Sequence, residues 1–218
     1  MGYSRCNWAF ITKSLAEVGF QWRGAQVLEL GNGRIREDVL PEINRGTPGF
    51  QTDKDPGYPL KDYVPKLGAV HVSLDINGKD GAEPFDLSRG DTWINLLNRF
   101  DLVLNPGTSE HVEPLTGQYH CFKHAHDMAK VGAIFCHLVP PVGSFVDHCR
   151  IHYTASFFER LAALNGYELL RIDAVPSLLP WAPPSNELQI GACLRKAVGR
   201  PFTEERDELL SHVRWSGP

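Results

Sequence analysis

Two glycines that directly follow a buried apolar run are the most informative feature of this 218-residue sequence. The run 27–30 contains one carboxylate, Glu29, and Gly31 and Gly33 follow at alternate positions. This pattern is typical of a buried parallel strand that ends in a tight turn, with backbone close enough to touch a ligand. A second strand-like run ends in Asp75, and a carboxylate at such a strand tip can accept both hydroxyl groups of a ribose. The two segments predict a nucleoside-bearing cofactor across the ends of a parallel sheet.

The shape of the turn argues against a dinucleotide. In the fingerprint G-x-G-x-x-G, three glycines let a pyrophosphate rest on a helix N-terminus. Gly31 and Gly33 supply the first two glycines, but Arg36 stands at the third position. Glu29 is expected to face the ligand, where its negative charge would repel phosphates and attract an ammonium or sulfonium group. The turn therefore favours a cationic ligand.

On these residues the chain resembles the class I S-adenosylmethionine-dependent methyltransferases. The first motif of that family reads (Glu/Asp)-x-Gly-x-Gly-x-Gly, and residues 29–35 match it except at the last glycine, where Ile35 stands. Asp75 resembles the acidic residue of the second motif. Two later segments, Asp86–Leu87 and Asn105–Gly107, resemble the third and fourth features. The resemblance covers about residues 20–200.

The resemblance implies an α/β fold of Rossmann-like type, with a seven-stranded, mostly parallel sheet, helices on both faces and a C-terminal antiparallel hairpin. It also implies S-adenosyl-L-methionine as cofactor and methyl transfer as the reaction. The turn after the first strand would hold the methionine end, Asp75 the ribose, Asp86 and Leu87 the adenine, and the segment after the fourth strand the floor near the sulfonium. The cofactor-binding residues expected in this way are Glu29, Gly31, Asn32, Gly33, Asp75, Ile76, Asp86, Leu87, Asn105 and Gly107.

Candidate bases follow the fourth and fifth expected strands. Methyl transfer requires alignment of the methyl group with a nucleophile, and a base assists when that nucleophile is a hydroxyl or an amine. Glu110 and His111 come directly after the fourth strand, and His148 lies in the irregular segment 140–153 after the fifth. We expect these three as catalytic candidates, with Asp147 or Glu110 orienting His148. The alternatives are a helix-capping Glu110, a His111 packed against its loop, and an exposed His148.

Histidine pairs raise the possibility of a metal. His120 and His124, like His148 and His152, are four residues apart, so each pair could chelate from one helix face. Neither pair has an H-E-x-x-H context, and no acidic trio for magnesium accompanies them. The sequence therefore predicts no metal, and it places His120 and His124 on a solvated helix face.

The acceptor is expected to be a small molecule. Asn105–Gly107 partly resembles the (Asn/Asp/Ser)-Pro-Pro-(Tyr/Phe/Trp) motif of methyltransferases that act on nucleic-acid bases, but Gly107 replaces the second proline and Thr108 the aromatic residue. The net charge is −4, and no Lys or Arg cluster exceeds a dipeptide, so a nucleic-acid partner is not indicated. A nucleic-acid base methyltransferase and a non-catalytic subunit that binds the cofactor stay as alternatives.

One domain is expected to span the chain, with a core over about 20–200. Strands are expected near 26–30, 69–75, 83–86, 100–104, 133–139, 167–174 and 187–195. Helices are expected over 7–19, 36–45, 90–98, 115–130, 154–165 and about 203–215. The Gly- and Pro-rich segment 46–67 is expected to be a long irregular loop, and such loops are usually functional.

The cysteines and the hydropathy pattern indicate where the protein works. The five cysteines are scattered and include no C-x-x-C pair, so neither a disulfide framework nor a thiolate zinc site is expected. No apolar segment reaches the length needed to span a bilayer. A reduced, cytoplasmic setting without a membrane partner is the expectation, and the oligomeric state is not predicted.

Overall fold

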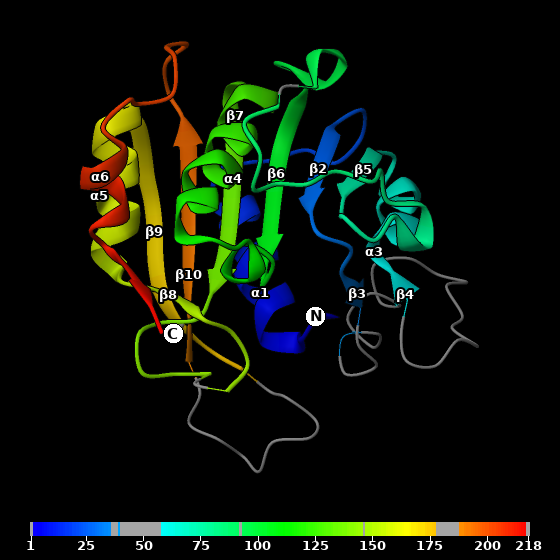
Figure 1. Cartoon of the computed structure of the whole chain (residues 1–218). Coiled ribbons are helices and arrows are strands. Elements are labelled where there is room, and N and C mark those ends of the chain that lie inside the picture. Colours follow the sequence, from blue (N-terminus) through cyan, green and yellow to red (C-terminus); the bar gives the residue numbers. More distant parts are fainter. Residues whose placement is uncertain are drawn as a thin grey trace.

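A six-stranded sheet forms the centre of the computed structural model, in the order β5-β2-β6-β7-β10-β9 (Figure 1). The residues that the structure describes are 2–35, 39, 58–91, 93–145, 147–177 and 188–216. The parallel strands are β2 (Gln26–Leu30), β5 (Val70–Leu74), β6 (Phe100–Pro106) and β7 (Ala129–Val139). The antiparallel strands are β9 (Tyr167–Pro176) and β10 (Leu188–Lys196). The mostly parallel sheet and its C-terminal antiparallel hairpin are confirmed.

The strand expected near 83–86 is reduced to one bridge, so the central sheet has six strands in the described part of the chain instead of seven. Glu83 pairs in parallel with Leu74. The ladder then loosens, because the Phe85 N–H reaches the Asp75 carbonyl oxygen only at 3.4 Å. Asp86 accepts the N–H of Ser88 at 2.9 Å, which turns the chain away from the sheet.

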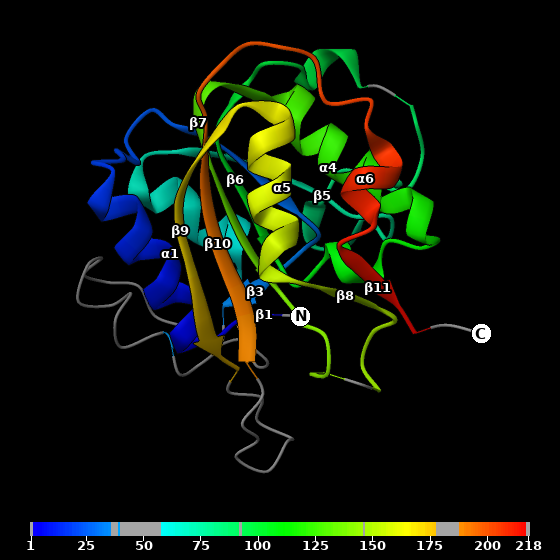
Figure 2. The same ribbon diagram turned by 90° about the vertical axis from the view of Figure 1, so that its left-hand side faces the viewer.

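Helices cover both faces of the sheet, as expected (Figure 2). On one face α1 (Arg5–Glu17) buries an apolar stripe that includes Trp8 and Ile11. On the other face α4 (Leu115–Met128), α5 (Ala155–Asn165) and the short α6 (Arg206–Leu210) pack around Phe122 and Phe157. Among the described residues, no helix combines the length and the apolar character needed to cross a membrane.

Two helices expected from the sequence are not formed as predicted. The prediction of a helix over 203–215 is wrong beyond α6, because Val213–Trp215 forms β11, which pairs antiparallel with β8 (Ile151–Tyr153). The residue types Val and Trp suit a strand that is buried on one side. The helix expected over 90–98 is only the 3₁₀ turn η4 (Ile94–Leu96), and Asn98 follows with φ of 49°.

Part of the segment expected to be a loop over 46–67 is helical. Leu60–Tyr63 forms α3 and Val64–Leu67 forms the 3₁₀ helix η2. The remainder of that loop up to residue 57, and the helix expected over 36–45 apart from the buried Val39, lie outside the described residues.

A second, three-stranded sheet lies at the C-terminal end of β2, in the order β1-β3-β4 (Figures 1 and 2). Its strands are β1 (Gly2–Tyr3), β3 (Arg34–Ile35) and β4 (Tyr58–Pro59). β1 runs parallel to β3, with Tyr3 opposite Ile35. Ile35 is fully buried and extended, which explains why a β-branched residue stands where the motif has a glycine. The chain leaves the turn as a strand, so the close helix packing that the third glycine permits is not needed there.

Candidate active site

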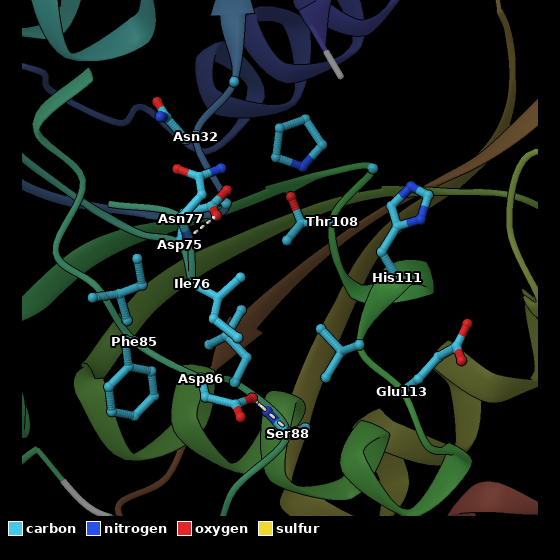
Figure 3. A pocket seen from close by; sticks show the side chains of 17 residues that line it. Asn32, Asp75, Ile76, Asn77, Phe85, Asp86, Ser88, Thr108, His111 and Glu113 are labelled. Atoms are coloured by element: carbon cyan, nitrogen blue, oxygen red, sulfur yellow. Dashed lines mark hydrogen bonds between the residues drawn. The ribbon is translucent and has the colours of Figure 1, made fainter. Parts of the chain in front are cut away.

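A cavity of about 420 Å³ opens at the C-terminal ends of β2, β5 and β6 (Figure 3). Asp75, Ile76 and Asn77 lie on one side of it, and Thr108 and His111 on the other. The predicted site residues that line the cavity together are Gly31, Asn32, Gly33, Asp75, Ile76, Asp86, Leu87, Gly107 and His111. Lining residues that sequence reasoning missed include Asn77, Phe85, Ser88, Thr108, Val112 and Glu113.

The two glycines of the turn are required for different reasons. Gly31 has φ of 82°, and a Cβ on it would lie 2.2 Å from Oγ1 of Thr108. Thr108 is fixed there because its hydroxyl donates to the Leu30 carbonyl at 2.8 Å. A Cβ on Gly33 would lie 2.6 Å from Oε1 of Glu29 and 2.7 Å from Cε2 of Tyr3. Thr108 beside Gly31, and Glu29 and Tyr3 beside Gly33, therefore leave no room for a side chain at either position.

Glu29 lies beneath the turn and does not line the cavity, contrary to the expectation that it faces the ligand. Only 1% of the residue is exposed. Its Oε1 accepts the hydroxyl of Tyr3 at 2.7 Å and the N–H of Gly33 at 3.0 Å. Its Oε2 lies 3.2 Å from Nε2 of His71. Glu29 is therefore a buried acceptor that organises the turn, because one of its carboxyl oxygens joins the Gly33 backbone to Tyr3.

Asp75 stands at the end of β5 with one carboxylate oxygen available to the cavity. Its Oδ1 accepts the N–H of Asn77 at 2.9 Å, and no described residue donates to Oδ2. Asn77 in turn accepts the N–H of Lys79 at 2.7 Å, so this corner is held by two consecutive side-chain turns. The rigid corner presents a hydrogen-bond acceptor that suits a hydroxyl group.

The far end of the cavity combines apolar walls with a second carboxylate. Ile76 is 73% exposed and lines the cavity, so its side chain offers an apolar surface to a ligand. Phe85 stacks on Trp93 with ring centroids 5.5 Å apart. The hydroxyl of Ser88 donates to Asp86 at 2.7 Å and lowers the pKa of that carboxyl. An amino-bearing aromatic ring fits this combination of surfaces.

Asn105 does not reach the cavity, although the sequence places it there. It is fully buried, and its Oδ1 accepts the Ser109 N–H at 3.1 Å while its Nδ2 donates to the Ser109 hydroxyl at 2.9 Å. Nδ2 also lies 3.1 Å from Nδ1 of His137. Asn105 thus shapes the loop from below, and Gly107, with φ of 76°, provides the cavity wall.

A second cavity of about 480 Å³ adjoins the first, and its lining is mostly polar. His111 and Glu113 line both cavities, and His148, Asp147 and Arg150 line only the second. The rings of His111 and His148 meet edge to face, with centroids 5.1 Å apart. Burial, followed by the neighbouring His148, lowers the pKa of His111 to about 4, so this imidazole is neutral at pH 7. The structure therefore brings two of the three catalytic candidates together.

Glu110, the third candidate, lies behind His111 and outside both cavities. Only 1% of it is exposed, and its Oε1 is 4.0 Å from Nε2 of His111. Its Oε2 is buried without a hydrogen-bond partner among the described residues. Burial raises the pKa of Glu110 to about 8, so the group keeps its proton at neutral pH. A protonated carboxyl group without access to the cavity does not act as a base there.

His124 is buried, contrary to the expectation of a solvated face. Its Nε2 lies 2.7 Å from the carbonyl oxygen of Arg89, so the ring contacts the backbone of the segment before η4. Within the described ranges, no three His, Cys, Asp or Glu residues are grouped so that they could hold a metal ion.

No family model and no curated protein matches this sequence. Solved structures do match. The 1,6-didemethyltoxoflavin-N1-methyltransferase of Burkholderia thailandensis, with bound 1,6-didemethyltoxoflavin and S-adenosylhomocysteine, has a TM-score of 0.58 at 16% identity, over 90% of this chain and 80% of that one. An S-adenosylmethionine-dependent methyltransferase of Mesorhizobium loti has a TM-score of 0.55 at 12% identity, over 87% and 97%. The N-methyltransferase NodS of Bradyrhizobium japonicum, in complex with S-adenosylhomocysteine, has a TM-score of 0.54 at 10% identity, over 88% of each.

Proposed function

We propose that the chain is a class I S-adenosylmethionine-dependent methyltransferase, the class of enzyme whose fold it has. It acts as a single domain on a small-molecule acceptor that has a hydroxyl or amine nucleophile. One observation carries the proposal. A single cavity at the ends of β2, β5 and β6 joins the glycine turn, Asp75 and Asp86. The glycine turn leaves room for an amino-acid tail, and the two carboxylates suit the hydroxyl groups of a ribose and the amino group of an adenine.

The cavity residues fit S-adenosylmethionine in order along the cavity. Gly31 and Gly33 leave bare backbone for the methionine end, since a Cβ at either position would collide with its neighbours. Asp75 keeps one oxygen for the ribose hydroxyls, and the exposed Ile76 and the Asp86 carboxylate flank the adenine. When bound, the cofactor supplies an electrophilic methyl group on its sulfonium.

His111 is the proposed general base. It lies on the wall shared by the two cavities, of which we assign the first to the cofactor and the second to the acceptor. Its neutral imidazole can take a proton from a hydroxyl group as that group attacks, or from the alkylammonium that a neutral amine forms by attacking. His148 meets it edge to face and is the second candidate. Glu110 is not part of this proposal, because its burial keeps it protonated and away from the acceptor.

Charge around the site supports a small acceptor over a nucleic acid. None of the described residues that line the first cavity is Lys or Arg, and Arg150 in the second cavity lies 3.5 Å from Glu113. A nucleic-acid methyltransferase requires a basic rim that neutralises phosphates. The Burkholderia structure, which holds a small heterocyclic acceptor, is consistent with this choice.

Calorimetry with S-adenosylhomocysteine tests the proposal. We expect micromolar binding to the wild-type protein and about tenfold weaker binding to Asp75→Ala, which loses the ribose acceptor. Glu159→Gln, an exposed change on α5, is the control and should bind as the wild type does. A wild-type protein that ignores the ligand at millimolar concentration would rule the proposal out. Binding without turnover on a panel of hydroxyl and amine acceptors would instead identify a non-catalytic subunit.

A further inference from the structure

A buried hydrogen-bonded cluster beneath the glycine turn connects strand β1 to the cofactor cavity. We infer that Tyr3 is a positioning residue for cofactor binding, which acts through Glu29 to hold the Gly33 peptide in its binding-competent shape. This inference rests on the proposed function, since it concerns the same cavity.

The geometry links Tyr3 to the cavity in two steps. The Tyr3 hydroxyl donates to Oε1 of Glu29 at 2.7 Å, and the same oxygen accepts the Gly33 N–H at 3.0 Å. The Gly33 carbonyl accepts the N–H of Leu60 at 3.0 Å, so this residue is held on both sides. Gly33 itself lines the cavity. Loss of the Tyr3 hydroxyl therefore affects Gly33, a residue of the cavity wall, because both groups bond to the same carboxyl oxygen of Glu29.

Burial and ring packing fix Tyr3 with its hydroxyl toward Glu29. It is fully buried, pairs with Ile35 through the backbone, and its ring meets Trp8 edge to face with centroids 5.9 Å apart. A Cβ on Gly33 would lie 2.7 Å from the Tyr3 ring, so ring and turn are in direct contact. Burial, and then Glu29, raise the pKa of Tyr3 well above its usual value, so the hydroxyl remains a donor.

Glu29 depends on Tyr3 for its orientation. Its Oε2 lies 3.2 Å from Nε2 of His71, on the opposite side of the carboxyl group from the turn. Without the hydroxyl of Tyr3, Oε1 has one donor fewer in a buried environment, and the Gly33 N–H is then its remaining donor, so the carboxyl group is held less firmly toward Gly33. The backbone of the turn then loses a fixed contact in the ligand-free protein, and ligand binding must restore that order.

Tyr167 offers a matched control. Its hydroxyl also makes a side-chain contact, which is partly buried and 2.7 Å from Nδ1 of His126, but it lies on β9 and lines neither cavity. Tyr167→Phe therefore removes a hydrogen-bonding tyrosine hydroxyl, as Tyr3→Phe does, without touching the glycine turn. The pair separates an effect on positioning from a general loss of stability.

Calorimetry with S-adenosylhomocysteine and hydrogen exchange on the full chain test the inference. Tyr3→Phe should weaken binding about tenfold and speed amide exchange over residues 29–35, whereas Tyr167→Phe should change neither by more than about twofold. The double variant Tyr3→Phe/Glu29→Ala should bind no more weakly than Glu29→Ala alone, because Tyr3 acts through Glu29.

Any of three binding results would overturn it: wild-type affinity in Tyr3→Phe, equal losses in both tyrosine variants, or additive losses in the double variant. Failure of the proposed function looks different. In that case the wild-type protein does not bind the ligand at all, and the faster exchange over 29–35 in ligand-free Tyr3→Phe would still identify the contact that holds the turn. Unchanged exchange in that variant would reject the positioning role by itself.

Discussion

The N–H of Gly31 donates to the carbonyl oxygen of Leu74 at 2.7 Å, so the turn after β2 is tied to the end of β5. This bond fixes the distance between the glycine turn and Asp75, the next residue after Leu74. The two halves of the proposed cofactor site therefore form one rigid unit before any ligand arrives. Pre-organisation of this kind reduces the ordering cost of binding.

Gly31→Ala should destabilise the protein by several kcal/mol and abolish cofactor binding, because it combines a positive φ with a collision against Thr108. Gly19→Ala is the control, since Gly19 has φ of 67° but nothing within 4 Å of a Cβ. Its cost should be only about 1–2 kcal/mol. Urea denaturation of both variants measures the difference, and equal costs would contradict the close packing around Gly31.

His111→Ala should lower kcat on an identified acceptor by about two orders of magnitude, with a smaller effect on cofactor affinity. The wild-type rate should stay constant as the pH falls from 8 to about 5.5, because the base is unprotonated above its lowered pKa of about 4. An acid limb near the usual histidine value of about 6.5 would point to another base. His148→Ala, measured in parallel, identifies which of the paired rings carries the proton.

Glu110→Gln should raise the melting temperature, and the gain should grow with pH. The pKa of Glu110 is raised from 4.5 to about 8 in the folded state, so the unfolded chain loses this proton first. The contribution of Glu110 to the free energy of unfolding is fully present below about pH 4.5. It is lost progressively as the pH rises to about 8, by up to a few kcal/mol. Melting curves at pH 5, 7 and 9 test this, with Glu159→Gln as the exposed control. A gain independent of pH would reject it.

Lys196→Met should cost about 2–4 kcal/mol without changing cofactor affinity. The Lys196 Nζ is buried and donates to the carbonyls of His126 and Ala129 at 2.7 and 2.9 Å, where α4 ends and β7 begins. Removal of the ammonium takes a charged donor away from both buried carbonyls. Lys123→Met, which breaks only a partly exposed pair with Asp127, should cost under about 1 kcal/mol in the same denaturation experiment.

The sequence by itself determined the parallel core and the outline of the cavity. The strands β2, β5, β6 and β7 fall within a few residues of their predicted ranges, because each is rich in aliphatic residues and has a clear end. Gly31, Asp75 and Asp86 line one cavity, since the carboxyl ends of neighbouring parallel strands share an edge.

Only the tertiary structure decided the direction in which each polar side chain points. The local sequence around Glu29, Asn105 and Glu110 does not indicate that all three are buried beneath the backbone that lines the cavity. The role of Tyr3 depends on the pairing of β1 with β3, a contact between segments far apart in the chain. The tail likewise forms β11 because β8 offers it an open edge, and long-range pairing of this kind overrides local helix propensity.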